Sequence, residues 1–93
     1  MTIQSFRCKH TKKLYEGKRV AKFANLIPVA ERKLQLLDSA ASLEFLRSPP
    51  GNHLEGLGGD RQGQHSIRIN DQFRLCFTWT EDGPVDVEIV DYH

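Results

Sequence analysis

The sequence has few cysteines and no long apolar run. Cys8 and Cys76 are its only two cysteines, and neither belongs to a CxxC motif or a Cys/His pair with the spacing of a zinc site. We therefore expect reduced thiols and neither a metal nor a cofactor. No segment approaches the roughly 18 apolar residues of a membrane helix, and the opening MTIQSFRCKH lacks the apolar centre of a signal peptide. These absences favour a cytoplasmic protein without a membrane partner.

Two enzyme signatures are also missing. The segment GLGGDRQG (56–63) lacks the Gly-Lys-Ser/Thr ending of a P-loop and the strand-before, helix-after context, so we do not expect a nucleotide there. Cys76 with His65 or His93 would be a nucleophile and its base. A lone strand cysteine is more often a small packing residue, however, and we favour that reading.

The charges are unevenly distributed. With 93 residues, 39% of them hydrophobic and 27% charged, the chain suits one domain (1–93) with one modest core. Residues 1–33 carry nine Lys and Arg against two Glu, whereas 76–93 carry five acids and neither Lys nor Arg. The basic third is able to bind phosphates by counterion release, or it is a solvated face. Its candidates for such contacts to phosphates are Lys9, Lys12, Lys13, Lys18, Arg19 and Lys22.

Helical patterns fill the first half of the chain. We expect a short strand at 3–6 and then a broken basic helix at 9–23, with a stop or bend at Gly17. The segment 27–46 has Pro28 in its first turn, and its apolar residues recur at helical spacing. The predicted buried face of this second helix consists of Ala30, Leu34, Leu37 and Ala41.

Strand patterns fill the second half. The Gly- and Pro-rich segment 47–64 reads as a connection, and alternating runs at 65–70, 73–80 and 85–92 read as strands. The fold class is therefore α+β, with two or three N-terminal helices packed on one face of a small, mostly antiparallel sheet.

The alternation also fixes the register of two strands. If Ile69 pairs with Phe73, both apolar faces point to one core and 70–72 form a three-residue loop. Arg68 then lies opposite Arg74 on the other face. Like charges directly opposed are destabilising, so either an anion lies between them, or each Arg extends into water or pairs with Asp60, Asp71 or Glu88.

The last strand ends in reactive side chains. Alternation directs Val85, Val87 and Ile89 to the core and turns the other set, Asp86, Glu88, Val90 and Tyr92, towards the arginines. Without a bulge, Asp91 points to the core side at the sheet's end, and His93 follows Tyr92. Arginines, a phenol and an imidazole suit cleavage of a ribose phosphodiester without metal, although a frayed end is the plainer reading of a terminal His.

The segments GDRQGQHSIRINDQFRLCFTW and VEIVDYH, with AERKLQLLDSA and RSPPGNHLE, resemble the HigB-type toxins of the RelE superfamily, also called plasmid maintenance killer proteins. The resemblance implies a RelE-like fold and a ribosome-dependent endoribonuclease that cuts mRNA in the ribosomal A site. It implies a HigA-like helix-turn-helix antitoxin as partner, with operator DNA bound only through that antitoxin. It also implies catalytic roles for Asp91, Tyr92, His93 and Arg74; Arg68 is our addition from register.

One position departs from the family pattern. Some members have a catalytic His four residues before the Gly-Asp-Arg turn, where this chain has Glu55, and the nearest His is His53. Either Glu55 transfers the proton, or His53 reaches in, or the chain is a weaker nuclease. The alternatives to a nuclease are a ParE-like inhibitor of DNA gyrase and a plain nucleic-acid-binding domain; the closing Tyr-His favours the nuclease.

Overall fold

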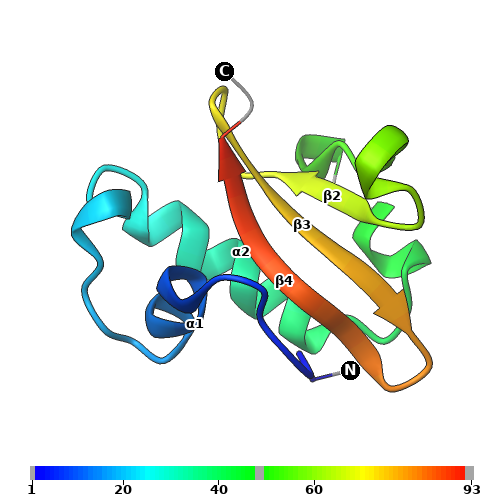
Figure 1. Cartoon of the computed structure of the whole chain (residues 1–93), viewed down its shortest axis with the longest axis horizontal. Coiled ribbons are helices and arrows are strands. Elements are labelled where there is room, and N and C mark those ends of the chain that lie inside the picture. Colours follow the sequence, from blue (N-terminus) through cyan, green and yellow to red (C-terminus); the bar gives the residue numbers. More distant parts are fainter. Residues whose placement is uncertain (1, 48–49, 92–93) are drawn as a thin grey trace.

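A computed structural model describes residues 2–47 and 50–91 of the chain. Within them, two α-helices precede a four-stranded antiparallel sheet of order β1-β2-β3-β4, and α2 crosses behind one face of the sheet (Figure 1). The elements are α1 (Lys9–Tyr15), α2 (Ile27–Ser39), β1 (Glu55–Gly56), β2 (His65–Arg68), β3 (Phe73–Thr80) and β4 (Gly83–Asp91). The predicted α+β class is confirmed. In the described part of the chain, no helix has the length and apolar character needed to cross a membrane.

The first helix ends where the sequence predicts. Gly17 has φ of 86°, its N–H donates to the Leu14 carbonyl, and the Lys18 N–H donates to the Lys13 carbonyl. This pair of bonds is a Schellman cap, which needs a left-handed residue that glycine supplies without strain. A short 3₁₀ turn at Ala21–Phe23 then leads into α2.

The second helix is shorter than predicted. Pro28 lies in its first turn, and Ala30, Leu34 and Leu37 are buried. The prediction that Ala41 shares this buried face is wrong, because the helix ends at Ser39 and Ala41 is exposed. Ala40, in an extended conformation with ψ of 128°, is the fully buried residue instead. Once the backbone leaves the helix, the 3.6-residue period no longer determines which side chain points inward.

The N-terminal segment runs beside β4 without forming the predicted strand. Its one bridge to the sheet is parallel, between Phe6 and Val87. Ser5 holds both sides of a distortion in β4, because its carbonyl accepts the Val87 N–H and its Oγ accepts the Asp86 N–H. Because its pairing with β4 is limited to this isolated bridge, the segment lies along the edge of the sheet without being one of its strands.

That distortion is a bulge in β4. Cys76 pairs with Glu88 and Thr78 pairs with Val85, so two residues of β4 lie opposite Phe77 alone, and Asp86 takes a positive φ of 54°. Paired residues point to the same side of a sheet, so Val85 shares the side of Thr78. The prediction that Val85 faces the core is therefore wrong. The predicted inward positions of Val87 and Ile89, which are 0% and 7% exposed, are confirmed.

The segment 47–64 was predicted as a connection and contains a strand that the pattern did not reveal. β1 is only two residues long and lies at the sheet edge, where Glu55 pairs with Ser66 and Gly56 with His65. An alternating pattern needs four or more residues to be recognised, and a strand of two residues therefore gives no sequence signal.

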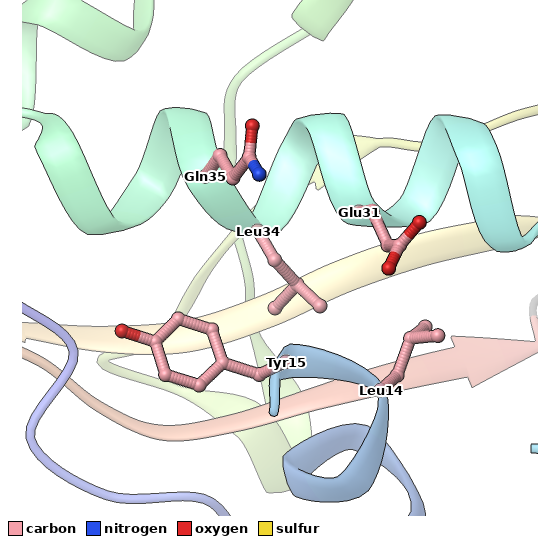
Figure 2. Close-up of a pocket in the computed structure, with 5 residues that line it drawn as sticks. All are labelled: Leu14, Tyr15, Glu31, Leu34 and Gln35. Carbon is pink, nitrogen blue, oxygen red and sulfur yellow. The ribbon is translucent and has the colours of Figure 1, made fainter. Parts of the chain in front are cut away.

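The core lies between α2 and one face of the sheet. It includes Ile67, Leu75 and Phe77 from the strands, packed with Leu34 and Leu37 of α2. Between the helices, a small hollow of about 50 Å³ is lined by Leu14 and Tyr15 of α1 and by Glu31, Leu34 and Gln35 of α2; Figure 2 shows Glu31 and Leu34 pointing towards α1. The Tyr15 hydroxyl donates a hydrogen bond to Asp38 Oδ1 of α2 at 2.9 Å.

Candidate functional site

The register of β2 and β3 places the two arginines as the sequence predicted. Arg68 pairs with Arg74 and Ile67 pairs with Leu75, and the Ile69 N–H donates to the Phe73 carbonyl at 3.0 Å. Asn70 stabilises the intervening loop, because its Oδ1 accepts the N–H of both Gln72 and Phe73. Local hydrogen bonding by an Asn side chain is a common way to hold such a turn.

Arg74 is the centre of a polar cluster on the outer face of the sheet, the face turned away from α2. Its Nε donates to Ser66 Oγ at 2.7 Å, and its Nη2 donates to the His53 carbonyl at 2.5 Å. The same Nη2 lies 3.8 Å from Glu55 Oε1, and the Arg74 side chain is only 13% exposed. The structure therefore brings together three residues singled out from the sequence: Arg74, Glu55 and His53.

His53 and Glu55 reach this cluster in different ways. His53 has a positive φ of 45° and contributes its backbone carbonyl, while the residue itself is exposed. Glu55, in β1, directs its carboxylate towards the guanidinium of Arg74. Of these two residues, Glu55 is thus the one that places a titratable group beside the arginine.

Arg68 is held differently from Arg74. It forms an ion pair with Asp71, whose side chain is 95% exposed, and Arg68 itself is 38% exposed. This pairing is one of the alternatives that the sequence left open. Exposed pairs of this kind contribute little, so Arg68 remains accessible to a competing anion. Burial lowers the pKa of Lys33 in α2, and the positive charges of Arg32 and Arg68 lower it further.

Asp91 marks the end of the described sheet. It pairs with Phe73, which puts its side chain on the side of Phe73, as the alternation predicted. Gln72 Nε2 donates to Asp91 Oδ2 at 2.9 Å and so orients the carboxylate. The predicted catalytic residues Tyr92 and His93 follow directly and lie outside the described residues.

A polar hollow adjoins Asp91 through Gln72. Its volume is about 240 Å³, and its lining comes from the α1–α2 connection and the β2–β3 loop. Lys22 lines it, together with Asn25, Asn70, Gln72 and Phe73. Among the six predicted ribosome-binding residues, Lys22 is therefore the one placed beside the Asp91 end of the sheet. All six are exposed, five of them along or just after α1.

Arg61 is a site residue that the sequence reasoning missed. Its Nη1 donates to Glu88 Oε1 at 2.6 Å and to Gln64 Oε1 at 3.1 Å, and the side chains of Arg61 and Glu88 are 30% and 16% exposed. The Gly-Asp-Arg turn stood out in the sequence, but its partner lies 27 residues away in β4. No local pattern connects the two positions.

The buried position of Cys76 fits the packing role that the sequence favoured, while His93, one of the two predicted bases for it, lies outside the described residues. Cys76 is fully buried on the outer face, between Ser66 of β2 and Glu88 of β4. His65 pairs with Phe77 and stacks on its ring with centroids 6.4 Å apart, so it lies on the opposite face from Cys76. The sheet itself thus separates these two side chains. Over residues 2–47 and 50–91, no cluster of three His, Cys, Asp or Glu is placed to hold a metal ion.

Two helices over one face of a short antiparallel sheet, with arginines on the other face, define a small α+β protein of RelE-like type. The HigB-like toxin family, RelE-like toxins of type II toxin-antitoxin systems, matches residues 4–93, and the chain belongs to this family. The resemblance seen in the sequence is thereby confirmed.

Two relatives show how far the likeness extends. The chain is 50% identical over 50 residues to Toxin HigB-1 of Vibrio cholerae, an alignment covering 54% of the chain and 53% of that relative. It is 39% identical over 70 residues to an uncharacterized protein of Haemophilus influenzae, covering 75% and 68%. The alignment with the Vibrio toxin thus spans about half of each protein.

Proposed function

We propose that this toxin is a ribosome-dependent endoribonuclease that cuts mRNA in the ribosomal A site and so arrests translation and growth. The observation that carries the proposal is the polar cluster in which Arg74 lies 3.8 Å from the Glu55 carboxylate and directly opposite Arg68. Two guanidinium groups can stabilise the negative charge that develops on a phosphodiester during cleavage, and the nearby carboxylate can accept a proton. Family membership supports the same reading.

The proposed chemistry is attack of the ribose 2′-hydroxyl on the adjacent phosphate. A general base removes the hydroxyl proton, arginines stabilise the doubly charged phosphorane, and a general acid protonates the leaving oxygen. We assign Arg74 and Arg68 to the phosphate. Proton transfer and orientation are assigned to Asp91, the last residue of β4, and to Tyr92 and His93, which follow it in the sequence.

Glu55 is our choice over His53 for the position where some family members have a histidine. The Glu55 carboxylate lies beside the Arg74 guanidinium, whereas His53 meets Arg74 through its carbonyl. A base must lie within reach of the proton it removes, and a phosphate held by Arg74 would bring its ribose next to Glu55.

The remaining assignments concern location and partners. The 93 residues act as one toxin domain in the cytoplasm and dock to ribosomal RNA through the six exposed basic residues, with Lys22 closest to the mRNA. The partner is a HigA-like helix-turn-helix antitoxin, and operator DNA is bound only through it. Reversing three charges, Lys9, Lys12 and Lys13 to Glu, should weaken ribosome binding and make its salt dependence shallower.

Mapping cut sites on one mRNA, with and without ribosomes, tests the function. The parental chain should cut only ribosome-bound mRNA. A chain lacking Tyr92 and His93 should not cut, although it remains folded by circular dichroism and still binds the antitoxin. Full-rate cutting by the shortened chain would show that Tyr92 and His93 are not catalytic residues. Absence of cutting together with inhibition of DNA gyrase would favour the ParE-like alternative.

A further inference from the structure

The strand that carries Glu55 is weakly held by its own pairing. β1 has two residues at the sheet edge, and one further backbone bond, from the Leu57 N–H to the Gln64 carbonyl at 2.9 Å, extends its hairpin with β2. Isolated pairings this short are marginal in water. Something beyond the ladder must fix the position of the Glu55 carboxylate.

The loop of this hairpin, residues 57–64, is rich in glycine. Gly59 and Gly63 have φ of 59° and 91°, and a 3₁₀ turn at Gly59–Arg61 is closed by the bond from the Arg61 N–H to the Gly58 carbonyl at 3.1 Å. Glycine makes the turn accessible but leaves many other conformations open to the loop. The sequence of the loop alone therefore does not hold it in one place.

The Arg61 side chain supplies the missing attachment. It reaches Glu88 of β4 at 2.6 Å, although β3 lies between β2 and β4. In the row that joins the strands, Ser66 pairs with Cys76 and Cys76 with Glu88, and Cys76 is fully buried. The Arg61–Glu88 pair thus fastens the loop across the outer face of the sheet. A charge-assisted bond that is largely shielded from water is stronger than an exposed pair.

A second attachment lies at the other end of the segment. Arg74 donates to the carbonyl of His53, two residues before Glu55, and to Oγ of Ser66, the residue opposite Glu55 in β2, so the chain is held just before Glu55. The distance from Glu55 to Arg74 is set by these two attachments together. Removing the one at Arg61 frees the loop end of β1 and lets the carboxylate move relative to the phosphate site.

We propose that Arg61 and Glu88 are a positioning pair that fixes Glu55 against Arg74 for the cleavage step. This proposal rests on the proposed nuclease function. The pair acts through the loop and does not touch RNA, so its loss slows chemistry and leaves ribosome affinity unchanged. Proton transfer between a base and a hydroxyl is sensitive to such displacements.

Four variants of the full chain test the pair: Arg61→Gln, Glu88→Gln, the reversed pair Arg61→Glu with Glu88→Arg, and Arg47→Gln as control. Arg47 forms an exposed ion pair with Glu44 at 3.1 Å, so the same substitution there removes an Arg–Glu pair that does not fasten the loop across the sheet. Each single variant of the positioning pair should lower the single-turnover rate of cutting ribosome-bound mRNA about tenfold, with ribosome Kd within about twofold. The reversed pair should restore most of the rate, and Arg47→Gln should cut at the parental rate.

Amide hydrogen exchange gives a readout independent of activity. Exchange in residues 54–64, measured by mass spectrometry on the same variants, should be faster in both singles and near parental in the reversed pair. Unchanged exchange overturns the proposal, whether or not the chain is a nuclease. Faster exchange with a parental cutting rate also overturns it, because the pair is then structural only. Absence of cutting by the parental chain is a failure of the proposed function, recognised separately by that control.

Discussion

Both faces of the sheet contain fully buried residues, but different kinds of side chain cover them. On the core face, Leu75 and Phe77 are fully buried under the apolar side chains of α2. On the outer face, Ser66 and Cys76 are also fully buried, yet the groups around them are charged. An apolar layer offers no polar group, whereas Arg61 and Arg74 place guanidinium groups and their hydrogen-bond partners over the outer face.

If the proposed function holds, this difference separates stability from catalysis along a single strand. Alternate residues of β3 serve the two purposes, with Phe73, Leu75 and Phe77 on one side and Arg74 and its neighbours on the other. A substitution on the core face should therefore act on the free energy of unfolding, and one on the outer face on the rate of cleavage. Four substitutions test this division, in decreasing order of expected effect.

The largest effect is expected for Phe77→Ala. Phe77 is fully buried in the core, so its removal leaves a cavity and should lower the free energy of unfolding by about 3–5 kcal/mol. Urea unfolding followed by circular dichroism measures this change. Thr78→Ala, one residue along and on the outer face, is the control and should cost no more than about 0.5 kcal/mol. Equal costs at the two positions would contradict the division of the faces.

Arg74→Ala should act mainly on the reaction. Loss of its guanidinium should lower the rate of cutting ribosome-bound mRNA at least tenfold, or about 1.4 kcal/mol, while the chain stays folded. Arg68→Ala should cost less, because the Arg68 side chain is 38% exposed and water screens its charge more than that of Arg74, which is 13% exposed. Single-turnover cleavage of both variants decides the matter. If Arg74→Ala cuts at the parental rate, the outer face does not contain the proposed phosphate site.

Tyr15→Phe examines the helix layer on the core side. The lost hydrogen bond to Asp38 should cost about 1 kcal/mol, less than one core aromatic. Burial raises the pKa of Tyr15, and the Asp38 hydrogen bond and charge raise it further, from an ordinary value of 10.0. The raised pKa means that this stabilisation is present below pH 10 and is lost as pH rises through the folded pKa.

The parental and Tyr15→Phe chains should therefore differ less in free energy of unfolding at alkaline pH. Urea titrations of parental and Tyr15→Phe chains at pH 8 and at pH 11 measure the gap at each pH. Asp38→Asn, which keeps an acceptor but removes the charge, serves as the comparison variant. A gap that widens with pH would show that the hydroxyl is not stabilised in its neutral form.

The smallest effect is expected for Asp86→Gly, at the bulge of β4. Asp86 has a φ of 54°, which glycine adopts without strain, so the substitution should stabilise the fold by about 0.5–1 kcal/mol. Asp86→Val should instead destabilise it, because a β-branched residue is disfavoured there. Thermal unfolding of the pair measures both signs. A destabilised Asp86→Gly chain would mean that the Asp side chain itself holds the bulge.

The sequence by itself determined the parts of this protein that depend on local pattern. Alternation in 65–70 and 73–80 determined the register that opposes Arg68 and Arg74, because a shift of one residue would turn every apolar side chain outward. Gly17 likewise determined the end of α1, since the left-handed cap needs glycine. Such features follow from neighbours within a few residues, whose steric and solvation preferences act before any long-range contact forms.

Only the tertiary structure decided the features made by distant partners. The bulge that turns Val85 away from the core is stabilised by Ser5, 81 residues from Asp86, and β1 exists because β2 offers an edge. The Arg61–Glu88 pair likewise joins positions 27 residues apart. Long flexible side chains can reach several acids from the same turn, and only the packed backbone determines which acid lies within hydrogen-bonding distance.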